Sequence, residues 1–193
     1  MLKLKLPTDP RWANIAEGNI EEILTDHAFC EQKAASTAIS LIITYPELSE
    51  LVTEMSALAR EEMSHFEMVH KHILKRGFKL GRERKDEYVG KLVKFFPQTP
   101  DRNLRLIHRL LVAALIEARS CERFKVLSEN ISDQELSRFY ASLMESEANH
   151  YTLFITFARK YGNRDEVDKL WDGLLSYEAE LMKNLGTSEL IHG

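Results

Sequence analysis

Apolar residues recur every three or four positions along most of this chain. The recurrence is continuous over five stretches, residues 20–45, 48–73, 106–127, 136–161 and 167–185. Such spacing places the apolar side chains on one face of an α-helix. The first two stretches are separated by Pro46 with almost no linker, so we expect them to form an antiparallel helical hairpin. The pattern predicts an all-α protein.

Glycine and proline residues mark the breaks between these stretches. Between residues 77 and 101 the apolar pattern fails, and we expect only a short helix near 86–95. Connections this long are usually functional or cross the length of a bundle, as some four-helix bundles require. Residues 1–14 read as an extended lead-in and residues 186–193 as a frayed tail. The run Ser132-Asp133-Gln134-Glu135 fits a capping box, headed by its serine, that opens the fourth helix.

Each of the four longest apolar faces is interrupted by a glutamate, and two of these glutamates have a histidine one turn later. The six residues are Glu31, Glu62, His65, Glu117, Glu147 and His150. A carboxylate and an imidazole three residues apart project from the same face of a helix. The spacing alone is weak evidence, because 22 Glu and 7 His in 193 residues predict roughly one Glu-x-x-His by chance, and the chain contains four.

Position separates these four occurrences. Glu67 lies about 140° around its helix from Glu62, on a charged outer face. Glu189 and His192 fall in the tail, and we expect both of these occurrences to be solvated. The occurrences that begin at Glu62 and Glu147 interrupt apolar faces, where an uncompensated carboxylate is costly.

The turns predict which glutamates meet. The point halfway between Glu31 and Glu62 falls at the break between the first two helices, and the point halfway between Glu117 and Glu147 falls at the start of the fourth. Residues equidistant from the turn of an antiparallel hairpin lie side by side. Both pairs should therefore meet at the same depth, about 22 Å along the helices from their turns.

Four inward carboxylates at one level repel each other unless they are protonated or bound to cations. Two divalent ions would balance four carboxylates with neutral histidines. One Glu from each of two helices and one Glu-x-x-His from each of the other two is the ligand set of the di-iron carboxylate bundles. Oxygen and nitrogen ligands without thiolate favour Fe or Mn over a structural zinc. The alternative is a buried polar network without metal.

Three further side chains bear on this cluster. His27 lies one turn before Glu31, and Cys121 one turn after Glu117. Each would serve either as a hydrogen-bond partner of a metal-bound group or as an ordinary core residue. Cys30 and Cys121 have no CxxC pairing, so we expect free thiols in a reducing cytoplasm.

The connection between the second and third helices is basic, although the whole chain has a net charge of −4. Eight basic residues against three acidic ones give it a local charge of +5, from Lys75, Arg76, Lys79, Arg82, Arg84, Lys85, Lys91 and Lys94 against Glu83, Asp86 and Glu87. One interpretation is a solvated loop. The other is a phosphate-binding patch whose interleaved aromatic side chains stack on bases, namely Phe78, Tyr88, Phe95 and Phe96.

Two classes of segment are not expected. The first residues contain no apolar stretch of the signal-peptide kind, and no run of about 18 apolar residues predicts a transmembrane helix. We therefore expect a cytoplasmic protein without a membrane partner.

With these residues in place, the chain resembles the ferritin-like di-iron proteins. More closely, it resembles the bacterial tRNA hydroxylases that act on 2-methylthio-isopentenyladenosine beside the anticodon. The resemblance spans the chain and rests on segments 27–35, 61–66, 117–124 and 147–151. It implies one ferritin-like domain over residues 1–193, a four-helix bundle with a long crossover between the second and third helices and an added C-terminal helix.

The resemblance also implies the chemistry. The six residues carried over as ligands of two Fe ions, with Mn as an alternative, are Glu31, Glu62, His65, Glu117, Glu147 and His150. The reaction would hydroxylate the isopentenyl group with O₂ and two electrons from an external reductase or ferredoxin-like donor. The tRNA phosphates would meet the basic crossover at Lys79, Arg82, Arg84 and Lys85. Related bacterial hydroxylases carry a threonine at the position of Cys121, so another group or water must deliver protons here.

Three alternatives remain open. A quinone-biosynthesis hydroxylase has a similar ligand set, but it needs an apolar membrane-facing surface, and the predicted outer faces are polar. An iron-storage or peroxide-scavenging protein is the second alternative, although rubrerythrin-type peroxidases usually carry paired cysteines. A metal-free interaction bundle is the third.

Overall fold

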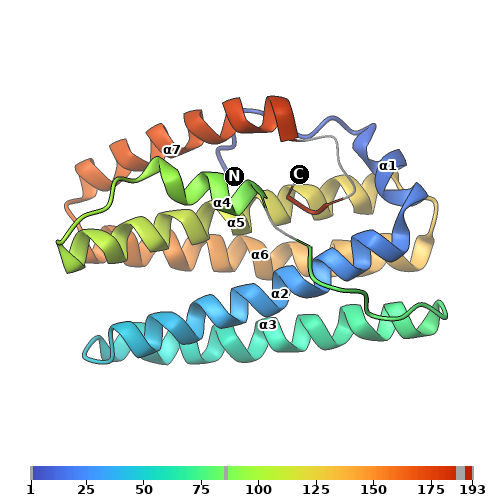
Figure 1. Ribbon diagram of the computed structural model, residues 1–193, viewed down its shortest axis with the longest axis horizontal. Coiled ribbons are helices and arrows are strands. Elements are labelled where there is room, and N and C mark those ends of the chain that lie inside the picture. Colours follow the sequence, from blue (N-terminus) through green and yellow to red (C-terminus); the bar gives the residue numbers. More distant parts are fainter. Residues whose placement is uncertain (1, 85–86, 186–189, 193) are drawn as a thin grey trace. The chain divides into compact units, whose positions relative to one another are not determined.

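The computed structural model describes residues 2–84, 87–185 and 190–192. Within these residues the chain forms seven α-helices and one 3₁₀ helix, and no strand (Figure 1). The prediction of an all-α protein is confirmed. No helix of the described residues is long and apolar enough to cross a membrane. The chain divides into two compact units, one built on α2 and α3 and the other on α1 and α4–α7.

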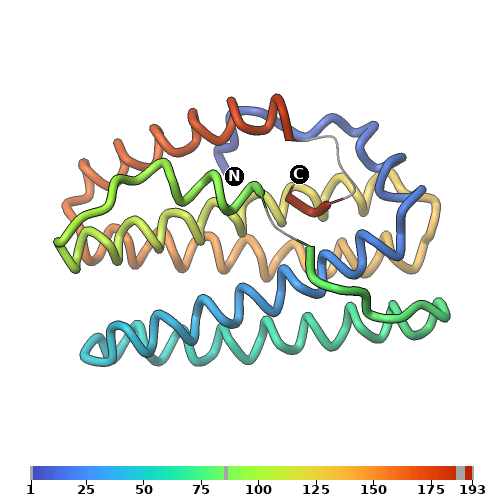
Figure 2. Tube along the Cα trace, in the orientation of Figure 1, coloured from blue at the N-terminus to red at the C-terminus, as the bar shows by residue number. Residues whose placement is uncertain are grey.

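The first unit is a helical hairpin. α2 (Ile20–Thr44) and α3 (Ser49–Lys75) run antiparallel, as the tube in Figure 2 shows, and the turn at Pro46 joins them. Both helices lie within two residues of the boundaries predicted from periodicity. After α3 the chain turns at Gly77, whose φ of 75° suits glycine, and segment 78–84 follows. The Gly81 amide lies 3.4 Å from the Thr25 hydroxyl, which holds this segment against α2.

The second unit is built on the hairpin of α5 (Arg102–Asn130) and α6 (Gln134–Tyr161). α7 (Arg164–Leu185) packs on this hairpin, and α4 (Glu87–Leu92) with the 3₁₀ helix η1 (Val93–Phe95) packs against α7. The short helix expected near 86–95 is therefore present.

Side-chain caps set where these helices begin. Asp101 accepts hydrogen bonds from two backbone amides at the start of α5, and Asp133 does the same for α6. The capping box predicted at Ser132 is wrong by one residue. The Ser132 amide instead donates to Glu17 at 2.7 Å. Glu17 belongs to α1 (Trp12–Gly18), a helix that begins inside the predicted extended lead-in and is too short to show a periodic pattern.

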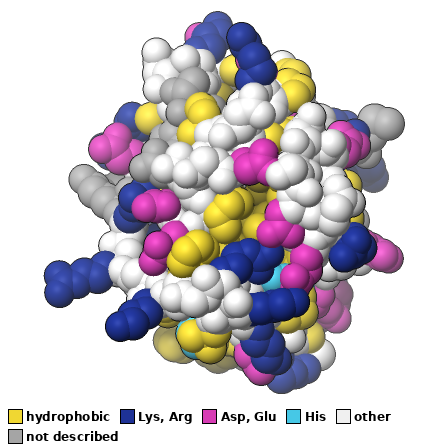
Figure 3. All heavy atoms as spheres, turned by 90° about the vertical axis from the view of Figure 1, so that its right-hand side faces the viewer, with side chains coloured by type: hydrophobic (Ala, Val, Ile, Leu, Met, Phe, Trp, Pro, Cys, Tyr) yellow, Lys and Arg dark blue, Asp and Glu magenta, His cyan; other side chains and the backbone are white. Residues whose placement is uncertain are grey.

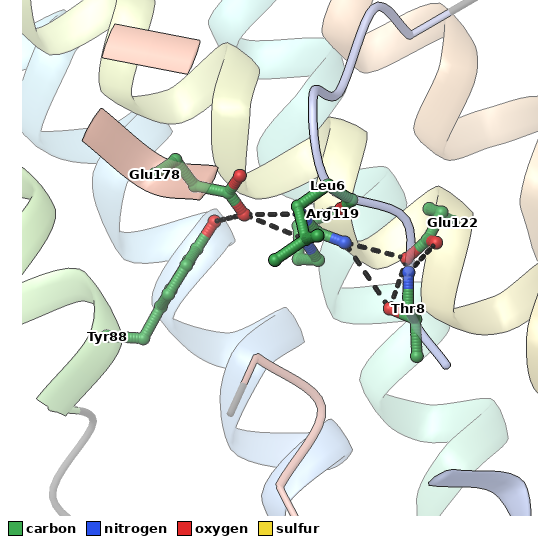
Figure 4. A network of polar contacts seen from close by, with 6 residues as sticks. All are labelled: Leu6, Thr8, Tyr88, Arg119, Glu122 and Glu178. Carbon is green, nitrogen blue, oxygen red and sulfur yellow. Dashed lines mark hydrogen bonds and ion pairs between the residues drawn. The ribbon is translucent and has the colours of Figure 1, made fainter. Parts of the chain in front are cut away.

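A buried ion pair fixes the lead-in and α7 to the same face of α5 (Figure 4). The Arg119 guanidinium is fully buried and donates to the Glu178 carboxylate at 2.8 and 2.6 Å. It also donates to Glu122 at 2.9 Å and to the Leu6 carbonyl at 3.0 Å. The Tyr88 hydroxyl donates to Glu178 at 3.3 Å, which ties α4 into the same network.

The described tail residues 190–192 are ordered against the protein, so the prediction of a frayed tail is wrong for them. The Ile191 amide donates to Asp26 of α2 at 2.8 Å, and the Ile191 side chain is fully buried. His192 is also buried, so its predicted solvation is wrong. A segment of three residues shows no helical period, so the sequence gave no sign of its burial. Glu189 lies outside the described residues.

Candidate metal centre

The α2–α3 hairpin brings together Glu31, Glu62 and His65, which we call the α2–α3 triad. All three are buried, and one ligand atom from each lies within 4.8 Å of the others. His65 Nδ1 is 3.5 Å from Glu31 Oε2 and 3.5 Å from Glu62 Oε2. The two glutamates meet because they are equidistant from the turn at Pro46. The predicted pairing within this hairpin is therefore present.

Hydrogen bonding decides the charge of this triad. Burial alone would raise the pKa of Glu31, but hydrogen bonds from His27 and His65 outweigh burial and hold the pKa below its usual range. Burial would likewise lower the pKa of His65, whereas Glu31 and Glu62 raise it to about 10. Without metal the two carboxylates therefore keep a proton on His65. A metal ligand must be the neutral imidazole, so a bound cation would replace that proton.

The α5–α6 hairpin brings together Glu117, Glu147 and His150, which we call the α5–α6 triad. All three are buried. His150 Nδ1 is 4.0 Å from Glu117 Oε2 across the hairpin, and Glu147 lies one turn before His150 on α6. Each hairpin thus presents two carboxylates and one imidazole, a donor set of oxygen and nitrogen atoms that suits Fe or Mn.

The two residues with open interpretations are now distinguished. His27 is fully buried, and its Nε2 lies 2.6 Å from Glu31 Oε1, so it orients that carboxylate. Cys121 is a core residue whose thiol donates to the Met144 carbonyl at 3.3 Å, and burial raises the pKa of this thiol. Cys30 and Cys121 are both free thiols, as predicted.

The basic crossover is only partly available to a ligand. Lys79, Arg82 and Arg84 are exposed in segment 78–84, whereas Lys85 lies outside the described residues. Glu83 in the same segment pairs with Lys33 of α2 at 3.1 Å. On the face drawn in Figure 3, basic side chains alternate with acidic ones, so the positive charge is local.

The aromatic residues of the crossover do not form a base-stacking surface. Tyr88 is fully buried, so the prediction that it stacks on bases is wrong. Phe96 is half-buried and stacks on His108, with ring centroids 4.1 Å apart. Phe95 packs on Tyr177 at 5.2 Å. These rings attach the crossover to α5 and α7.

Sequence comparison covers the same residues. The family described as tRNA-(MS[2]IO[6]A)-hydroxylase (MiaE) matches residues 2–193. The chain belongs to this family. A relative from Pseudomonas putida, named tRNA 2-(methylsulfanyl)-N(6)-isopentenyladenosine(37) hydroxylase, is 38% identical over 181 residues, which cover 94% of this chain and 87% of the relative. A Salmonella typhimurium protein of the same name is 28% identical over 211 residues, covering 84% and 77%.

A solved structure gives the fold class of the MiaE-family chain. "Protein 43 with aldehyde deformylating oxygenase activity from Synechococcus" superposes with a TM-score of 0.91 at 32% identity, covering 98% of this chain and 95% of that one. The fold is a ferritin-like helical bundle, as the sequence predicted.

Sequence reasoning missed Arg119, Glu178 and His192. Arg119 and Glu178 are charged residues on helices that also carry exposed charges, so nothing in the pattern marked them as buried. Glu178 falls between Leu174 and Leu181 on the apolar stripe of α7, which is the one available signal.

Proposed function

We propose that this chain is an O₂-dependent tRNA hydroxylase. Its substrate would be the isopentenyl side chain of 2-(methylsulfanyl)-N6-isopentenyladenosine at position 37, beside the anticodon. The observation that carries the proposal is the MiaE-family match over residues 2–193, supported by two relatives that bear this name. A tRNA substrate also implies a cytoplasmic protein.

We infer that the two triads together bind a pair of metal ions in a single ferritin-like domain. The ligands would be Glu31, Glu62, His65, Glu117, Glu147 and His150. Four carboxylates with neutral imidazoles carry a charge of −4, which two divalent cations cancel. Fe is the expected metal and Mn the alternative, because the donors are oxygen and nitrogen without thiolate. When bound, the metal pair supplies the activation of O₂ that attack on an unactivated C–H bond requires, which no side chain provides.

The protein's own residues have defined tasks in this scheme. His27 holds Glu31 in one orientation through its 2.6 Å hydrogen bond, as partners of metal-bound carboxylates commonly do. Lys79, Arg82, Arg84 and Lys85 would contact tRNA phosphates, which carry most of the affinity in such complexes. Two electrons would come from an external redox protein.

The direct test uses metal-loaded, reduced protein with O₂ and tRNA that carries the isopentenyl modification. After digestion, mass spectrometry of the nucleosides should show the gain of one oxygen atom. Protein with His150→Ala serves as the control and should give no oxidised nucleoside. Unchanged nucleosides from wild-type protein that is iron-loaded and reducible would refute the proposal.

Aldehyde deformylation is a second candidate, favoured by the likeness to the Synechococcus oxygenase. The same loaded protein should therefore be offered a long-chain aldehyde in a parallel reaction. Release of formate and a shortened hydrocarbon, without nucleoside oxidation, would favour this second activity.

A further inference from the structure

The tail histidine His192 is held in a fixed position inside the α4–α7 unit. It is 4% exposed, and its Nε2 lies 3.0 Å from Ser120 Oγ of α5. Its ring stacks on Tyr88, with centroids 5.4 Å apart and an interplanar angle of 21°. The Tyr88 hydroxyl in turn donates to Glu178, which Arg119 holds (Figure 4). A buried imidazole with its ring plane and one ring nitrogen both fixed is more than a tail anchor needs.

Ser120 connects this imidazole to the α5–α6 triad. It lies one turn after Glu117 on α5, where side chains three residues apart are neighbours. Helical serines often bond the carbonyl four residues back, whereas this hydroxyl faces His192. The other protic side chain of the turn, Cys121, donates to the Met144 carbonyl. The polar route from this turn of α5 therefore runs through Ser120 to His192.

We propose that Ser120 and His192 form a buried proton relay that serves the metal centre from the Glu117 side. The inference rests on the proposed function. Hydroxylation follows R–H + O₂ + 2e⁻ + 2H⁺ → R–OH + H₂O, with the electrons from an external redox protein, so two protons must enter the buried site. Nε2–H of the His192 imidazolium gives its proton to Ser120 Oγ while the hydroxyl's own proton moves on. Solvent then reprotonates the imidazole, and Tyr88 acts as a positioning residue for its ring.

The first test does not depend on turnover. Protein labelled with ¹⁵N-histidine is compared by NMR without metal and after loading with Zn²⁺, which is diamagnetic and redox-inert, and His192→Gln assigns the signal. The His192 Nε2 resonance should shift on zinc loading in wild-type protein, and the shift should be several-fold smaller in Ser120→Ala. A His192 signal that does not respond to zinc in the wild type would overturn the relay.

The second test measures coupling, the amount of oxidised nucleoside formed per O₂ consumed. His192→Phe keeps the stack on Tyr88 and removes the ring nitrogens, and Ser120→Ala removes the hydroxyl. Because proton delivery by a positioned acid contributes about 10²- to 10⁴-fold and water can replace part of it, we expect coupling to fall roughly tenfold in both variants. Ser120→Thr should restore it. Metal content and melting temperature should stay close to wild type.

The matched control is His108→Phe, because His108 is another buried histidine that stacks on an aromatic ring in the same unit. This control should keep wild-type coupling. Full coupling in His192→Phe or in Ser120→Ala would overturn the relay, and if His192→Phe loses metal, Ser120→Ala decides. If wild-type protein fails to oxidise the nucleoside, the proposed function fails, while the zinc response still decides the relay.

Discussion

Replacing Arg119 by Met should expose how much the buried ion pair contributes to stability. The guanidinium is fully buried and makes hydrogen bonds of 2.6 to 3.0 Å to Glu178, Glu122 and the Leu6 carbonyl. Methionine fills a similar volume but leaves the Glu178 carboxylate buried without its cation. Removing one partner of a buried pair costs about 3–5 kcal/mol. That is a large share of the ~5–15 kcal/mol that stabilises a typical domain.

The loss should depend on pH in a defined direction. Burial raises the pKa of Glu178 above its usual 4.5, although Arg119 opposes the rise. Without Arg119 the pKa of Glu178 in the folded protein rises further. A raised carboxyl pKa destabilises the folded state as pH increases from 4.5 towards the folded value, because the unfolded chain ionises first. We therefore expect the variant to lose about 3–5 kcal/mol at pH 7.5. At pH 4 only the hydrogen-bond contribution of about 1–2 kcal/mol should be lost.

Urea unfolding at the two pH values measures this difference, provided that the slope m stays unchanged. The matched control is Arg159→Met, which breaks a partly exposed pair with Asp168 and should cost at most about 1 kcal/mol. The double variant Arg119→Met/Glu178→Met should regain most of the lost stability. Equal losses at pH 4 and pH 7.5, or a loss below about 1 kcal/mol, would refute the reasoning.

Three further predictions concern the metal centre and the tRNA. His65, with a metal-free pKa of about 10, must lose its proton to bind metal, so Zn²⁺ affinity in chelator competition should rise about tenfold per pH unit from 6 to 8 for each proton released. A pH-independent affinity would contradict this. Glu147→Ala should lose metal and hydroxylation together by metal analysis and nucleoside mass, and retained metal with full activity would remove it from the ligand set. Four alanine substitutions in the crossover should weaken tRNA binding and flatten its salt dependence by up to ~0.9 per lost phosphate contact, with Lys169→Ala as an unaffected control; they are Lys79, Arg82, Arg84 and Lys85.

Periodicity and turn position predicted the parts of the fold that repeat. The helices, the crossover and the meeting of Glu31 with the Glu62/His65 turn follow from spacing along one hairpin. The same reasoning placed Glu117 opposite His150. These are contacts whose geometry depends on helix rise and turn position, both of which can be counted along the sequence.

Contacts between elements far apart in the chain could not be counted in this way. Ser132 was expected to cap α6, but Glu17 of a short helix takes its amide and Asp133 caps instead. Tyr88 looked like a base-stacking residue because it lies among charges, yet Glu178 and His192 hold it in the core. In each case a partner more than 70 residues away decides the environment, and no local pattern reports it.

The polar residues of α5 show why a one-sided view of this helix fails. Arg119 lies about 200° around the helix from Glu117, so an amphipathic reading that buries Glu117 would expose Arg119. Both are buried, because α7 and the lead-in cover the face opposite the α6 contact. The Arg119–Glu178 pair therefore fixes the rotation of α5 about its axis, and this rotation sets where Glu117 and Ser120 point. Arg119→Met should consequently weaken metal binding although Arg119 is no ligand, and Arg119→Met/Glu178→Met, which restores packing without the fixed geometry, should recover stability more completely than metal affinity.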